Sequence, residues 1–121
     1  MVEHRVLQSI LQGLLDFELR VRTEASNVVR SLVLRGCSQS ANVLLSSGVL
    51  DYLKLGLEDL DRTILSNSVV SSVFLIHHNS VDPGTLESSR ILPALESMLY
   101  KPNAPLSDCL IEFFNQIETL N

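Results

Sequence analysis

The chain has 121 residues, of which 45% are hydrophobic and 19% charged, and this balance excludes an intrinsically disordered protein. Its length fits one domain, by the usual span of roughly 100–200 residues. The formal net charge of −5 argues against a nucleic-acid binder, and the longest apolar run, residues 73–76, is too short to cross a membrane. No secretion signal is expected at the amino-terminal end, where charged residues interrupt the apolar ones.

The two cysteines, Cys37 and Cys109, lie in no CxxC or Cys/His cluster, so neither a zinc site nor a redox motif is expected. Two free thiols fit a reducing compartment, which predicts an intracellular protein of the cytoplasm or nucleus. A long-range disulfide between them is the alternative.

Apolar residues recur at spacings of three and four, which predicts an all-α fold, and no useful stretch alternates with the period of a strand. Gly36, Gly48, the turn at 82–84 and the segment 101–105 separate the apolar stretches as helix breakers do. Pro83 and Pro105 suit the first turn of a helix. The predicted helices span residues 3–15, 19–35, 38–47, 49–58, 62–78, 84–89, 90–100 and 105–119.

The apolar pattern also repeats along the chain. An offset of 42 aligns three triplets, which are Leu7/Leu11/Leu15, Val49/Leu53/Leu57 and Ile91/Leu95/Leu99. An offset of 41 aligns three sets on the longer helices, Ala25/Val28/Val29/Leu32, Ser66/Val69/Val70/Val73 and Ser107/Leu110/Ile111/Phe114. We therefore predict one domain of three units, approximately 1–36, 37–79 and 80–121, which bury their apolar faces by stacking.

Two segments carry a resemblance to a known superfamily. Residues 46–53 (SSGVLDYL) resemble the passage between the first two helices of an armadillo repeat, and residues 16–25 (DFELRVRTEA) resemble the acidic loop and basic helix start of armadillo and HEAT units. The resemblance implies a right-handed α-α superhelix, an armadillo-like solenoid of about two and a half to three repeats. The chain departs from the family pattern in two ways. Its first unit lacks the short first helix, and it contains no tryptophan, the residue with which family members hold extended basic peptides in their groove.

No chemistry-bearing motif emerges. Asp59 and Asp61 begin like a calcium loop, but Ile64 and Val70 occupy the places of the required glycine and glutamate, so an interhelix loop with Asp61 as a helix cap is expected. The adjacent histidines 77 and 78 point about 100° apart on a helix, unlike the zinc pair at i and i+4. We expect no enzyme, no metal and no cofactor.

Partner-binding residues are predicted on the long helices, which line the concave surface in this superfamily. On the predicted helix 19–35, the expected core consists of Val21, Val28, Val29 and Leu32, and the opposite face carries Thr23, Asn27 and Arg30. The same face carries Ile64, Ser68 and Ser71 on helix 62–78, and Cys109, Glu112 and Gln116 on helix 105–119. The predicted site comprises Asn27, Arg30, Ser68, Ser71, Glu112 and Gln116. Small serines there would let a partner approach closely, and tight packing of neighbouring repeats against them is the alternative.

Charge is distributed unevenly, with a net of +1 over residues 1–36 and −6 over residues 37–121. This asymmetry would orient a partner, or else it is an ordinary solvated surface. The leading hypothesis is a non-enzymatic module that holds a protein or peptide partner in its concave groove. The alternative is a structural segment of a larger helical scaffold, which self-associates or meets further repeats through the end helices 3–15 and 105–119. A helical enzyme with an unrecognised site is a weaker third reading.

Overall fold

The computed structural model describes residues 4–36, 38–78 and 81–98, and all of its regular structure there is helical. The predicted helix at 105–119 and the predicted site residues Glu112 and Gln116 lie outside these residues. Seven helices follow one another in the described ranges: α1 (His4–Gly13), α2 (Leu19–Arg35), α3 (Ser38–Ser46), α4 (Val49–Gly56), α5 (Arg62–His78), α6 (Pro83–Ser89) and α7 (Ile91–Met98). The all-α prediction is confirmed.

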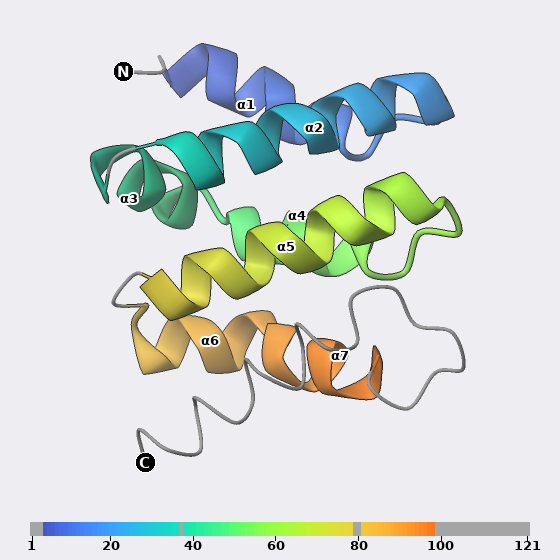
Figure 1. The fold of residues 1–121 in the computed structure, drawn as a ribbon. Helices are drawn as coiled ribbons and strands as arrows, with labels where there is room; N and C mark the ends of the chain where they lie inside the picture. The colour runs from blue at the N-terminus through green and yellow to red at the C-terminus, as the bar shows by residue number, and fades with distance from the viewer. Residues whose placement is uncertain (1–3, 37, 79–80, 99–121) are drawn as a thin grey trace.

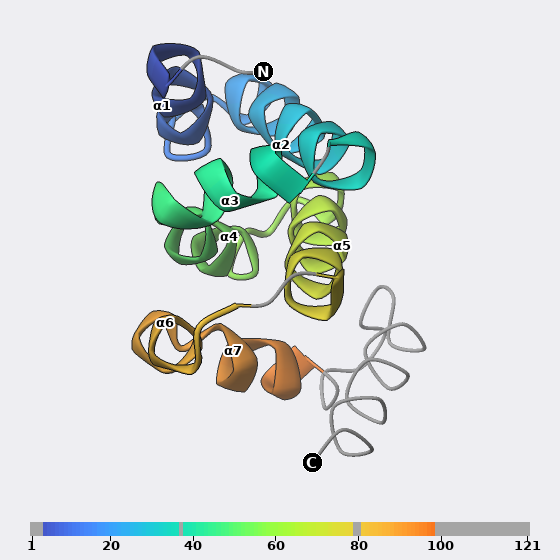
Figure 2. The ribbon, with the colours of Figure 1, turned by 90° about the vertical axis from the view of Figure 1, so that its left-hand side faces the viewer.

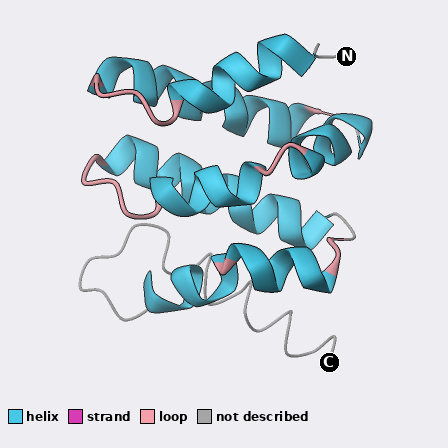
Figure 3. Ribbon diagram, turned by 180° about the vertical axis from the view of Figure 1, so that it is seen from behind, coloured by secondary structure: helices cyan, strands magenta, loops and turns pink. Residues whose placement is uncertain are grey.

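The helices form three successive layers, which Figure 1 shows from top to bottom as α1–α2, α3–α5 and α6–α7. The two long helices, α2 and α5, make the most extensive contact between elements. Figure 2 shows them on one side of the molecule, with α1, α3, α4 and α6 on the other. Seen from behind, the loops between α1 and α2 and between α4 and α5 lie at the same edge (Figure 3).

Local chemistry sets the helix boundaries. The Asp61 carboxylate accepts a hydrogen bond from the Ile64 amide at 3.0 Å, which confirms the predicted cap at the start of α5. Asp82 caps α6 in the same way through the Thr85 amide, with Pro83 in the first turn as predicted. Gly48 separates α3 from α4 with φ of 81°, a left-handed conformation that a side chain would strain.

The core follows the first predicted alignment closely. All members of the three apolar triplets that the structure describes are buried except Leu15. Leu15 is exposed because α1 ends at Gly13, two residues before the predicted end. The buried members are Leu7, Leu11, Val49, Leu53, Leu57, Ile91 and Leu95.

The long helices follow a different offset from the predicted one. α2 and α5 each have 17 residues, and both their first and last residues lie 43 positions apart. The helix before each long helix ends in a glycine, Gly13 or Gly56. A Cβ atom added to Gly13 would lie 3.1 Å from the Cβ atom of Ala25, and one added to Gly56 would lie 3.0 Å from that of Ser68. Ala25 and Ser68 are therefore structural counterparts, and the predicted offset of 41 is two residues too short.

This shift changes which side of α2 is buried. Val29 and Val33 are buried on α2 together with Ala25 and Ser26, whereas Val21 and Val28 are 37% and 39% exposed. The expected core around Val21 and Val28 is wrong for those two residues, because the helix turns Ser26 and Val33 inward instead. α5 is covered on most sides, as its buried residues show; they are Ile64, Asn67, Ser68, Val69, Ser71, Ser72 and Leu75.

Candidate functional site

Two of the predicted groove residues are not on a surface. Ser68 is 1% exposed and Ser71 is 0% exposed, so the expectation that both face solvent is wrong. Ser68 packs against Gly56 of α4 and donates its hydroxyl to the Ile64 carbonyl at 2.8 Å. Its small side chain serves the contact between α4 and α5, two helices of one predicted unit, whereas the packing alternative expected a contact between neighbouring repeats. The physical reason is the 43-residue offset, which places Ser68 where α2 has the core residue Ala25.

Asn27 and Arg30 are exposed, and both also bond to the neighbouring layer. Asn67 of α5 donates to Asn27 Oδ1 at 2.8 Å and to Ser26 Oγ at 3.0 Å. Its own Oδ1 atom accepts from Arg30 Nη1 at 3.1 Å. Asn67 is buried, and this network joins α2 to α5 with a fixed register, because each polar atom of the amide has a partner.

A second cross-layer interaction starts from Arg22 on α2. Its Nε atom lies 3.0 Å from Asp59 Oδ2, in the loop between α4 and α5. Its Nη1 atom donates to the carbonyls of Asp16 and Phe17, at 2.9 and 3.0 Å, in the loop between α1 and α2. One guanidinium therefore holds both loops, and side-chain accessibilities of 24% and 14% for Arg22 and Asp59 show that the ion pair is shielded from solvent.

The side of α2 that turns away from α5 is left uncovered. We call this side, with Val21, Glu24, Val28, Ser31 and Arg35, the end face. Two open hollows of about 360 and 390 Å³ run along it and share Val28, and Ile10 of α1 also lines the first. Seven of the nine large hydrophobic residues that are exposed in the described part of the chain belong to the first 35 residues. Exposed apolar surface is therefore concentrated in the α1–α2 layer.

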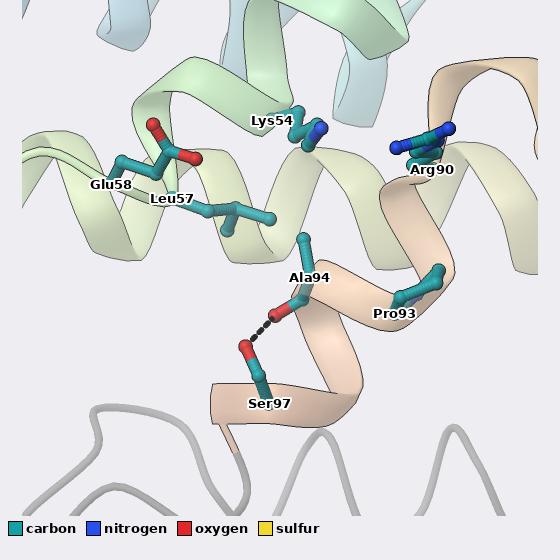
Figure 4. Close-up of a pocket in the computed structure, with 7 residues that line it drawn as sticks. All are labelled: Lys54, Leu57, Glu58, Arg90, Pro93, Ala94 and Ser97. Carbon is teal, nitrogen blue, oxygen red and sulfur yellow. Dashed lines mark hydrogen bonds between the residues drawn. The ribbon is translucent and has the colours of Figure 1, made fainter.

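A further cavity of about 310 Å³ lies between α4 and α7. Figure 4 shows Glu58 and Arg90 towards opposite ends, with Lys54 between them. The Ser97 hydroxyl on its wall donates to the Ala94 carbonyl at 2.8 Å, so its hydrogen is already used. Arg90 ends α6 in a left-handed conformation with φ of 57°. Of the predicted site residues, the four that the structure describes do not line this cavity.

Over the residues that the structure describes, no group of three or more His, Cys, Asp or Glu side chains is arranged to hold a metal ion. No helix in the same part of the chain is both long and apolar enough to span a membrane. No protein-family model, curated protein or solved structure matches the chain.

Sequence reasoning missed the Asn67 network, the Arg22 interactions and the end face. The sequence carries a signal for them in the repeated pattern Asp-apolar-acid, found at Asp16-Phe17-Glu18 and again 43 residues later at Asp59-Leu60-Asp61. Aligning these two loops, rather than the apolar residues of the long helices, gives the offset that the structure shows. Apolar residues spaced at three and four are a weaker guide, because a shift of a few positions aligns them almost equally well.

Proposed function

We propose that this chain is a non-enzymatic protein-interaction module, an armadillo-like segment of a right-handed helical solenoid that works through its end face. A module that works through its end face corresponds to the alternative hypothesis, a segment of a larger helical scaffold, and not to the hypothesis of a partner held in a concave groove. The hydrogen bonds between layers support a solenoid, since they join residues 37 to 41 positions apart, including Gln12 to Tyr52 and Ser26 to Asn67. Contacts at about one repeat length are typical of stacked repeats.

The observation that carries the proposal is that corresponding residues of α2 and α5 differ in their exposure to solvent. On α5, Ile64 and Ser71 are buried, and they lie within one turn of Asn67 on the side that bonds to α2. Their counterparts on α2 are Val21 and Val28, which are more than one-third exposed. The same helix side is thus covered in the second layer and open in the first.

The partner that fits the end face is a further helical layer. In the contact between α2 and α5, Arg30 of the covering helix donates to Asn67 of the covered one. The counterpart of Asn67 on α2 is Glu24, which is exposed. A covering helix with lysine or arginine opposite Glu24 and small or apolar residues over Val28 would reproduce the contact, with a carboxylate in place of the amide.

Site-specific photo-cross-linking tests this proposal. A photoreactive phenylalanine analogue at Val28 should capture, in cells, an amphipathic helical segment from another chain or a second copy of this one. Glu24→Lys should weaken the capture by like-charge repulsion. The matched control places the same analogue at Leu55, an exposed apolar residue on α4. Equal labelling from both positions, or capture of only extended segments at Val28, would overturn the proposal.

A further inference from the structure

The loops before the two long helices share one conformation. Each has five residues, at 14–18 and 57–61. In the first, Asp16 Oδ1 accepts a hydrogen bond from the Glu18 amide at 2.9 Å, and in the second, Asp59 Oδ1 accepts one from the Asp61 amide at 3.0 Å. Each aspartate thereby closes a turn around the residue that follows it. Those enclosed residues are Phe17 and Leu60, and we call them the tip residues.

Both tip residues are fully exposed. They are the two most exposed large hydrophobic side chains of the described residues, and the next most exposed, Leu55, has about half its surface accessible. Single apolar residues scattered over a surface need no explanation. Two at equivalent places, each presented by the same closed turn, form a repeated feature.

Arg22 holds the two tips on one edge of the molecule. Its guanidinium bonds to the carbonyls of Asp16 and Phe17 and to the carboxylate of Asp59, so the two loops are bridged by a single side chain. Figures 1 and 3 both show the α1–α2 and α4–α5 loops one above the other along the same edge. The loops that carry the two tip residues therefore lie side by side despite their distance in sequence.

The surroundings of the tips are acidic. Asp16, Glu18, Glu58 and Asp61 lie within two residues of a tip, and none of them forms an ion pair with another described residue. Arg20 and Arg62 follow the two loops, so carboxylates outnumber the free cations locally. This balance attracts lysine and arginine side chains and disfavours an anionic lipid surface.

We propose that the tip residues form a docking edge for an extended protein segment with two apolar side chains and flanking lysines or arginines. Packed helices lie about 8–10 Å apart, which sets the expected separation of the two tips. A polyproline II segment rises about 3.1 Å per residue and repeats every three residues, so apolar side chains at i and i+3 would reach both tips. This edge is separate from the end face, and the inference stands independently of the proposed function.

The docking edge can be tested with a library of peptides, from which those that bind the chain are selected. Random ten-residue peptides displayed on phage are selected on the purified chain and counter-selected on the double variant Phe17→Ser/Leu60→Ser. We expect enriched peptides to carry two apolar residues three positions apart and at least two basic residues. The matched control, Val6→Ser/Leu55→Ser, removes two other exposed apolar residues and should bind the same peptides as the wild type.

Fluorescence then measures binding at each tip, because the chain contains no tryptophan of its own. Emission from Phe17→Trp and from Leu60→Trp should shift to shorter wavelength with the selected peptide. Replacing the other tip by serine should weaken binding by about tenfold, the effect of losing one apolar anchor. Helical circular dichroism should stay at the wild-type level. Enrichment no greater than on the double variant, enrichment of acidic peptides, or a shift with phosphatidylserine vesicles but not peptide would each overturn the proposal.

Discussion

The helices α2 and α5 have the same length and the same place in their layers, yet their surroundings differ sharply. α5 lies between two other layers, and even three of its four serines are buried. α2 lies at the edge of the stack, and apolar residues such as Val28 remain exposed. Residue type therefore does not decide burial on these helices. The position of a helix in the stack does, because each repeat buries its faces only against its neighbours.

A charge introduced at Val28 and at its counterpart Ser71 should give the largest difference between the two helices in the free energy of unfolding. Ser71→Asp places an unpaired carboxylate on a fully buried site and should lower the free energy of unfolding by about 3–5 kcal/mol. Val28→Asp should cost about 1 kcal/mol or less, because this site is open to water. Urea denaturation followed by circular dichroism measures both. Similar losses for the two variants would show that the α2 side is covered as well.

The network between the long helices provides an intermediate effect. Asn67→Ala removes the amide that bonds to Ser26, Asn27 and Arg30, and we expect a loss of about 1–3 kcal/mol in the free energy of unfolding. The counterpart variant Glu24→Ala removes an exposed side chain and should change the free energy of unfolding by less than about 0.5 kcal/mol. The same denaturation measurement applies, and equal values for the pair would contradict the role given to Asn67.

Variants at the starts of α5 and α2 should give the smallest difference in the free energy of unfolding. Asp61→Ala removes the side-chain cap of α5 and should lower the free energy of unfolding by about 1 kcal/mol. Glu18 stands at the same place before α2 and makes no side-chain cap, so Glu18→Ala should leave stability near that of the wild type. Thermal melting should separate the two variants by roughly 4 °C. A larger loss for Glu18→Ala would mean that its carboxylate supports the first loop in another way.

The candidate site was only partly predictable. Asn27 and Arg30 are exposed as expected, although both also bond to Asn67 of the next layer. Ser68 and Ser71 were placed with them through an alignment two residues out of register, although both are buried. Serine fits a tight helix contact as well as it fits solvent. Its identity alone therefore gives no sign of which side of α5 it occupies.

The sequence by itself determined the helices and where they begin, since apolar spacing, Asp61 and Asp82 caps and a left-handed glycine act within a few residues. It did not determine every end, because α1 and α4 each stop two residues before the predicted position. It also determined most of the core on the shorter helices. Only the tertiary structure decided the offset between α2 and α5, the burial of the serines and the exposure of Val28. Those properties depend on contacts between residues about 40 positions apart, such as Asn67 with Ser26, and no local pattern specifies which neighbour covers a helix side.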